Sequence, residues 1–214
     1  MHWIYNPEVR QVWMEKNLQQ YHTETISDSP ETGDKRTGIL RFLLDVVETL
    51  ILSVVLFAAI NAVSARIRVD GASMEPTLQS GEFVIVNKLA YILGRPAIGD
   101  VIVFHFPRDP EQEYIKRVIG LPGDHVEVLG GQVYVNGQPL VEDYIAAAPA
   151  YGDNTWDVPE DALFVLGDNR NNSSDSHNWG YVPLDYVIGK AVIVYWPPTE
   201  WGVLKHSSTA SAAP

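Results

Sequence analysis

Ser73 and Lys116 are two residues of this chain whose types and surroundings could form a catalytic pair. Ser73 lies in the stretch 71–78, eight residues after a long apolar run, and Lys116 lies in the stretch 114–117. No histidine that could serve as a base stands near either residue in the sequence. A serine hydroxyl needs a base to take its proton, and a lysine is such a base only when neutral. The pair therefore indicates a serine nucleophile activated by a lysine, at a membrane surface.

Lys116 needs a low pKa for this role. An unperturbed lysine, with a pKa of about 10.4, is neutral in roughly four molecules in ten thousand at pH 7. Burial against Tyr114, Ile115 and Met74 would disfavour the ammonium and lower the pKa. A pKa of about 8 requires about 3 kcal/mol of destabilisation and raises the neutral fraction to about a tenth. We therefore expect Lys116 to be buried.

A third segment, residues 166–180, is dense in polar side chains and follows an apolar strand pattern. Taken alone, a serine in a turn or a lysine on a strand is common without any catalytic role. A solvated loop would be unusually rich here in groups that could orient a buried amine. This segment favours one site built from all three stretches.

The segments 73–78, 114–124 and 167–179, in this order, resemble the sequence boxes of type I signal peptidases. With the preceding apolar run and the strand pattern 99–104, the resemblance covers roughly residues 46–196. The first 38 residues and the tail after Trp196 lie outside it.

The resemblance implies a membrane-anchored serine endopeptidase that cleaves exported precursors on the outer face of the membrane through an acyl-enzyme. It makes Ser73 the nucleophile and Lys116 the base. It makes Ser173 the serine that hydrogen-bonds the lysine. It also implies that three polar residues hold this region in shape: Asp168, Arg170 and Asp175.

Substrates of this family carry small residues at the first and third positions before the cut. The resemblance assigns the shallow apolar pockets for them to five residues: Val69, Met74, Leu78, Tyr114 and Ile115. An extended substrate could add as a strand beside the residues before Ser73 and those before Lys116, with affinity from main-chain hydrogen bonds.

Two positions depart from the family pattern. Gly71 stands where many members have a serine that contributes a hydroxyl to the oxyanion hole, which leaves the backbone N–H of Ser73 as the main donor. His177 stands where an arginine commonly pairs with the loop aspartate, and we hypothesise that this makes the loop pH-sensitive. The stretch between Lys116 and Gly167 is short, so we expect no large inserted second β domain.

Composition excludes several classes of site. The chain has no cysteine, which removes disulfides, thiolate metal sites and a cysteine nucleophile. Its net charge of -12 argues against nucleic acid as a partner, because affinity for phosphates comes largely from lysine and arginine. His105, His125 and His177 show no metalloprotease spacing. We expect neither a metal nor a cofactor.

Residues 49–65 carry no charge, and the run reaches 20 residues when it is extended back to residue 46, across Glu48. At about 1.5 Å per residue this length spans the roughly 30 Å hydrocarbon core of a bilayer. A buried core helix is the alternative. A cleaved signal peptide fits less well, because some 48 residues precede the run. We expect one span, whose orientation the flanking charges do not decide.

After residue 65, short apolar runs alternate with Gly, Pro and Asp, a pattern typical of strands and turns. Strands are expected at 67–69, 83–87, 100–106, 114–120, 125–129, 132–135, 162–166 and 187–195. This predicts a mostly β domain built as a folded-over sheet or partial barrel. The apolar run 89–94 is expected to be a loop that dips into the bilayer or an ordinary core segment.

The expected organisation is a solvated segment at 1–38, a membrane anchor helix at 39–65, a β-rich peptidase domain at 66–198 and a tail at 199–214. Expected partners are preproteins with signal peptides and the lipid bilayer, with the export translocon as a candidate. Two alternatives stay open: a non-catalytic, membrane-tethered preprotein-binding module and a soluble self-cleaving repressor-type peptidase. Self-cleavage at 62–65 or 148–150 is a further hypothesis.

Overall fold

The computed structural model describes residues 11, 14–18 and 35–205. The expectations for the rest of the segment 1–38 and for the end of the tail, residues 206–214, fall outside these described residues. The chain divides into two compact units, Met1–Val55 and Leu56–Pro214.

The long helix α2 (Lys35–Val63) contains all but the last two residues of the apolar run. It has no proline, and the hydroxyls of Thr49 and Ser53 donate to backbone carbonyls four residues earlier, at 2.8 and 2.7 Å. Such back-bonding satisfies polar groups where water is absent. Its segment Gly38–Val63 is long and apolar enough to cross a membrane, and the described side chains along it are exposed rather than packed in a core. α2 is therefore a candidate membrane span.

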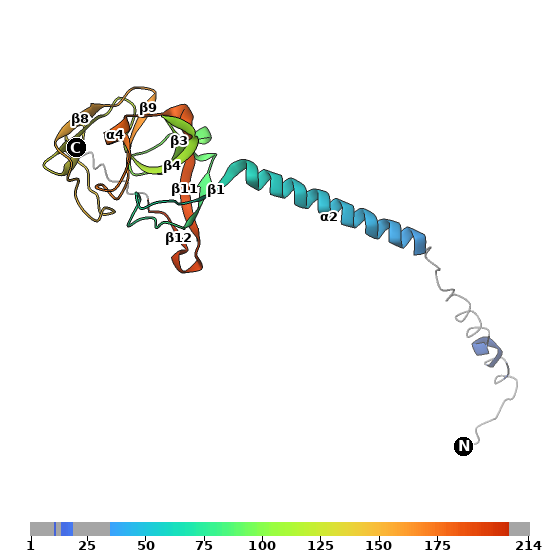
Figure 1. The fold of residues 1–214 in the computed structure, drawn as a ribbon. Helices are drawn as coiled ribbons and strands as arrows, with labels where there is room; N and C mark the ends of the chain where they lie inside the picture. The colour runs from blue at the N-terminus through green and yellow to red at the C-terminus, as the bar shows by residue number, and fades with distance from the viewer. Residues whose placement is uncertain (1–10, 12–13, 19–34, 206–214) are drawn as a thin grey trace, which may run out of the picture. The chain divides into compact units, whose positions relative to one another are not determined.

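The β-rich unit contains an antiparallel sheet in the order β1-β2-β11-β3-β4-β9-β10, with β12 paired to β11. Figure 1 shows β3, β4 and β9 side by side in this sheet. The strands are β1 (Ser64–Arg68), β2 (Phe83–Asn87), β3 (Val101–Phe106), β4 (Asp109–Gly120), β9 (Ala162–Leu166), β10 (Val182–Pro183), β11 (Val187–Trp196) and β12 (Gly202–Val203).

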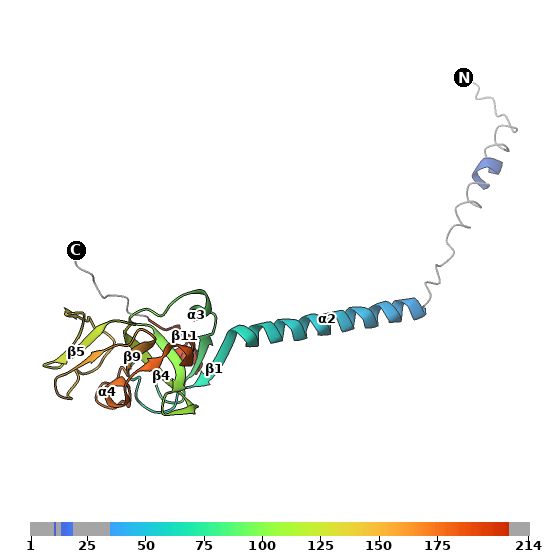
Figure 2. The same ribbon diagram turned by 90° about the horizontal axis from the view of Figure 1, so that it is seen from above.

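A smaller antiparallel sheet has the order β7-β6-β5-β8. Its strands are β5 (His125–Leu129), β6 (Gln132–Val135), β7 (Gln138–Pro139) and β8 (Asn154–Asp157). Four short helical segments complete the unit: α3 (Ala90–Leu93), α4 (Ser176–Trp179), η1 (Leu184–Tyr186) and η2 (Pro198–Glu200). In Figure 2, α3 lies next to β11.

The burial of the strands follows from their sequences. β2 alternates, with Val84 and Val86 buried and their neighbours partly exposed, as a strand with one face on the core should. All five residues of β9 are buried, and this strand is a continuous apolar run. One core cluster, which includes Met74, Leu78 and Val101, lies beneath the turn that carries Ser73. This packing gives the turn a rigid base.

The expected mostly β fold after one apolar helix is confirmed, with differences in detail. The helix begins earlier than residue 39 and ends at Val63, because the backbone from Ser64 onward pairs with β2. β4 begins at Asp109 rather than at 114, and β8 had no strand signal that we recognised. The run 89–94, expected as a loop, contains the one-turn helix α3.

Candidate active site

The structure brings Ser73 and Lys116 together from two elements. Ser73 lies in the turn between β1 and β2, which is closed by hydrogen bonds from Val69 N to Glu82 O (2.8 Å) and from Gly81 N to Val69 O (2.9 Å). Lys116 lies on β4. Lys116 Nζ donates to Ser73 Oγ at 2.7 Å, although the two residues are 43 positions apart. A proton can pass between these atoms directly.

The surroundings of Lys116 favour the neutral amine. The residue is 4% exposed, and burial lowers its pKa from 10.5 to about 8, against the opposing charges of Asp175 and Asp168. Nζ also donates to the carbonyl of Ile115 at 2.9 Å and lies 5.4 Å from the centre of the Tyr114 ring. The pKa is close to the value that the chemistry requires.

The polar loop, residues 167–175, follows β9 and packs directly on the Ser73 turn. Asn169 donates from its backbone N to Ser73 O and from its side chain to Ala72 O, each at 3.0 Å. Gly167 lies so close that an added Cβ would overlap both the Ser73 carbonyl oxygen and the Ser173 hydroxyl. A glycine is therefore needed at position 167 for the loop and the turn to meet.

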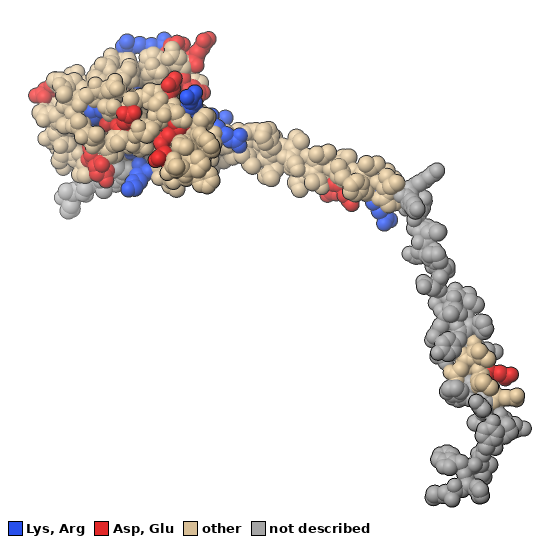
Figure 3. Space-filling view, turned by 60° about the horizontal axis from the view of Figure 1, so that its bottom comes forward, with Lys and Arg blue, Asp and Glu red and all other residues tan. Residues whose placement is uncertain are grey.

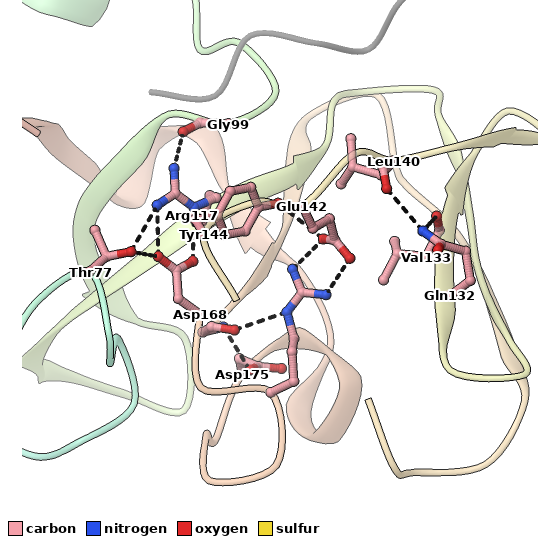
Figure 4. Close-up of polar contacts among 12 residues, drawn as sticks. Thr77, Gly99, Arg117, Gln132, Val133, Leu140, Glu142, Tyr144, Asp168 and Asp175 are labelled. Carbon is pink, nitrogen blue, oxygen red and sulfur yellow. Dashed lines mark hydrogen bonds and ion pairs between the residues drawn. The ribbon is translucent and has the colours of Figure 1, made fainter. Parts of the chain in front are cut away.

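Asp168 is fully buried in an ion pair with Arg117, the neighbour of Lys116 on β4. Arg117 donates to both carboxylate oxygens, at 2.8 and 2.7 Å, and to the carbonyl of Gly99 at 2.8 Å. Thr77 donates to Asp168 at 2.5 Å, and the Tyr144 ring covers the guanidinium at 3.9 Å. Figure 4 shows this network, which ties the Ser73 turn, β4 and the polar loop together.

Arg170 and Asp175 fix the position of the same loop. Arg170 forms a two-pronged ion pair with Glu142 and donates to Gly167 O at 3.0 Å. Asp175 accepts from Gly167 N at 2.9 Å and caps the start of α4. Both side chains are buried, so the loop has few alternative positions.

Ser173 does not make the contact that the resemblance implies. Its hydroxyl is buried and has no hydrogen-bond partner among the residues that the structure describes, and Lys116 bonds to Ser73 and Ile115 instead. Ser173 Oγ lies against Gly167 and so remains beside the site. Its role in orienting the lysine stays a prediction that requires the Ser173 side chain to rotate.

A groove of about 650 Å³ runs past Ser73 and Lys116. Of the five residues expected to form substrate pockets, Val69, Tyr114 and Ile115 line this groove. Met74 and Leu78 do not: they are 1% and 0% exposed and belong to the core beneath the turn. This corrects their expected position, because both side chains are packed in the core and are not among the residues that line the groove.

The turn before Ser73 has a conformation suited to glycine. Gly71 has φ of 89°, a region that residues with a side chain rarely adopt, and its N–H donates to Ser80 Oγ at 3.2 Å. None of the hydrogen bonds within the described residues uses the Ser73 N–H. That amide is therefore available as a donor to an oxyanion.

His177 lies where it can pair with Asp175. Its Nδ1 is 2.6 Å from Asp175 Oδ1, and its ring stacks on Tyr151 with centroids 4.1 Å apart. The proposed pH sensitivity of the loop stays a prediction. Among the described residues, no group of three or more His, Cys, Asp or Glu side chains could hold a metal ion.

Sequence reasoning missed Arg117, Glu142, Tyr144 and Asn169 as parts of this site. Arg117 and Asn169 lie inside the segments 114–124 and 167–179, directly after Lys116 and Asp168. This position in the sequence could have identified them as parts of the site. Glu142 and Tyr144 come from the connection between β7 and β8, where the sequence shows nothing that points to Arg170 or Arg117.

Comparison with known proteins places these residues in a family. The family described as "Signal peptidase, peptidase S26" matches residues 43–196. A signal peptidase I of Leptolyngbya laminosa is 46% identical over 170 residues, covering 76% of this chain and 84% of that protein. A probable signal peptidase I-2 of Synechocystis sp. is 43% identical over 176 residues, covering 79% and 80%.

A solved signal peptidase I from Enterococcus faecalis is 38% identical and covers 44% of this chain and 95% of its own, with a TM-score of 0.41. The family match covers most of the chain, and the relatives from Leptolyngbya and Synechocystis are 46% and 43% identical to it. The chain therefore belongs to the signal peptidase I family of S26 peptidases, the enzymes that remove signal peptides.

Proposed function

We propose that this signal peptidase uses Ser73 as nucleophile and Lys116 as general base, and that it cuts preproteins after small residues. The observation that carries the proposal is the 2.7 Å contact between Ser73 Oγ and a buried lysine whose pKa is lowered to about 8.

In the neutral state, Lys116 Nζ accepts the proton of Ser73 as Oγ attacks the scissile carbonyl carbon. The resulting ammonium gives that proton to the leaving amine when the C–N bond breaks, which leaves an ester on Ser73. Lys116 Nζ, neutral again, then takes a proton from a water molecule as that water attacks the ester carbonyl. The C–O ester bond breaks, Lys116 returns the proton to Ser73 Oγ, and the carboxylic acid product leaves. The N–H of Ser73 supports the oxyanion in both steps, in place of a side chain at Gly71.

Substrate selection follows from the groove. We expect an extended peptide to pair with main-chain groups of two segments that line the groove, the residues before Ser73 and those before Lys116. Ile115 and Val69 line the groove near the nucleophile, and a large side chain next to the cut would meet them. Small residues before the cut are the expected consequence.

The enzyme is anchored by α2 as a single-pass protein, with the β-rich unit on the outer face. The length and apolar character of Gly38–Val63 and the exposure of its side chains support this proposal. The short connection from the end of α2 through β1 keeps Ser73 near the surface at which a preprotein emerges.

The test is cleavage of a model preprotein in detergent micelles by the wild type, Ser73→Ala and Lys116→Ala. We expect each substitution to reduce kcat/KM by at least about 10³-fold, because the nucleophile and its base act as a unit. Lys205→Ala, an exposed lysine outside the groove, is the matched control and should retain activity.

Cleavage that survives in either variant would overturn the mechanism. Wild-type protein that binds preproteins without cutting them would indicate the binding module instead. Cleavage confined to the chain itself would indicate the self-cleaving alternative. Intact-mass measurement after long incubation detects self-cleavage, which should occur in the wild type and not in Ser73→Ala.

A further inference from the structure

A second groove, of about 910 Å³, lies on the β-rich unit and shares no lining residue with the Ser73 groove. This volume is within the range of roughly 300–1,000 Å³ that is typical of ligand sites. Its walls come from the end of α2, from α3, and from the segments 121–122 and 184–188. Most of its lining is apolar, including Ala62, Tyr91, Leu121, Leu184 and Ile188.

The strand register places this groove at the level where the candidate span ends. β1 and β2 pair with Ser64 opposite Asn87, and the N–H of Lys88 donates to Val63 O at 3.0 Å. Val63 is the last residue of α2, so Lys88 is level with the end of the helix. If α2 crosses the bilayer as proposed, this groove opens at the membrane interface.

The helix α3 presents apolar side chains beside the groove. The Tyr91 hydroxyl points inward and donates to Asp100 at 2.9 Å, which fixes the orientation of the helical turn. As a result, Ile92 and Leu93 are 73% and 83% exposed. Apolar residues this exposed are costly in water and favourable in a membrane interface.

Two cations line the same groove. Lys88 and Arg95 form no ion pair with any residue that the structure describes. One acidic residue, Glu160 from the connection before β9, also lines the groove, so the two cations leave its lining with a net positive charge. Figure 3 shows Lys and Arg side chains gathered on the part of the β-rich unit that the chain enters from α2. Unpaired cations beside an apolar groove match a ligand with a phosphate and a hydrocarbon chain.

We propose that this groove binds one anionic phospholipid, with an acyl chain along its apolar wall and the headgroup phosphate between Lys88 and Arg95. The inference rests on the proposed membrane anchoring by α2 and extends it. Its consequence is that the lipid fixes the rotation and depth of the β-rich unit at the surface, and so the height of Ser73 above the membrane.

The experiment uses the full chain in nanodiscs of equal parts phosphatidylglycerol and phosphatidylcholine. Electron paramagnetic resonance with a spin-labelled lipid of each kind gives the ratio of their association constants. We expect the wild type to prefer phosphatidylglycerol, with about a fivefold contribution from each cation. Lys88→Gln combined with Arg95→Gln should bring the ratio close to one. The control Lys205→Gln should keep the wild-type ratio.

A second variant, Leu184→Gln, tests the apolar wall without changing the charge of the groove. It puts a polar side chain where the acyl chain would lie and should lower the association constants of both lipids. Preprotein cleavage in micelles should stay near the wild-type rate in all these variants, which shows that they fold. A ratio that does not change in the double variant overturns the lipid site. A chain that does not insert into the nanodiscs overturns the anchoring as well, which distinguishes the two failures.

Discussion

The burial of Lys116 lowers the stability of the folded protein and also lowers the pKa of its amine. A buried ammonium is energetically costly, and the same desolvation that destabilises it favours the neutral amine that the proposed base requires. The lowering of the pKa of Lys116 from 10.5 to about 8 corresponds to about 3 kcal/mol. Two predictions follow from this value, one for activity and one for stability.

The activity of the enzyme should rise with pH through the pKa of Lys116. The neutral fraction of an amine with a pKa of about 8 grows from about a tenth at pH 7 to about nine-tenths at pH 9. We therefore expect kcat/KM for a model preprotein to rise about ninefold over this interval. A pH–rate profile in micelles measures it, and a change of less than about twofold would contradict the assignment of Lys116 as base.

The stability of the wild type should also rise with pH, between about 8 and 10.5. In this window Lys116 is neutral in the folded protein and still protonated in the unfolded chain, so the unfolded state binds more protons. Lys116→Met removes the titration. We expect this inactive variant to be more stable than the wild type at pH 7, by about 1–3 kcal/mol, with the difference shrinking toward pH 10.5.

Denaturant unfolding of both proteins in the same detergent, at several pH values, measures the difference. If the gap between the two proteins does not change with pH, Lys116 does not have a lowered pKa in the folded state.

At the scale of elements, the site depends on how the polar loop meets the Ser73 turn. Three buried contacts converge there: the pair of Arg117 and Asp168, the pair of Arg170 and Glu142, and the bond from Gly167 N to Asp175. The sequence boxes are thus close in space because ion pairs and main-chain bonds link the elements that carry them. The tightest approach is at Gly167.

Gly167→Ala adds only one methyl group but should impair catalysis strongly. The added Cβ would overlap the Ser73 carbonyl oxygen and displace the turn from Lys116. A misplacement of about 1 Å can cost on the order of 10²-fold in rate, and we expect a loss of this size in kcat. The matched control is Gly152→Ala, where nothing lies within 4 Å of the added Cβ. Equal cleavage rates for the two variants would show that the close approach is not required.

At the scale of the whole molecule, function depends on where the β-rich unit stands relative to the bilayer. The main chain links Val63 to Lys88, and Ile92 and Leu93 are exposed. With α2 anchored as proposed, we expect this end of the unit to touch the membrane and the active site to meet the cut site of a preprotein as it leaves the bilayer.

A spin label can locate this contact, because the chain has no cysteine and a single introduced one is labelled selectively. In liposomes, a label at Leu93→Cys should be accessible to dissolved oxygen and shielded from a water-soluble nickel reagent. A label at Val141→Cys, 59% exposed on the connection after β7, is the control and should show the reverse. A label at position 93 that behaves like the control would place α3 in water.

Much of the fold could be read from local pattern. The long apolar run predicted α2, and alternation between turn residues predicted most of the strands, because these signals depend on neighbours a few residues apart. The ends of the helix and strands were less predictable: Ser64–Arg68 pairs with β2 as the strand β1 instead of continuing the helix. The resemblance assigned Met74 and Leu78 to substrate pockets, and in the structure both are buried in the core, because a sequence resemblance does not show which side chains face the core.

The ordered boxes in the sequence were enough to identify Ser73, Lys116 and the polar loop as candidates. Composition removed cysteine chemistry and argued against nucleic acid as a partner. Only the tertiary structure decided the pKa of Lys116, the partners of Arg117 and Arg170 and the isolated state of the Ser173 hydroxyl. The reason is physical: burial and charge pairing depend on atoms that folding brings together from 28 to 51 residues apart.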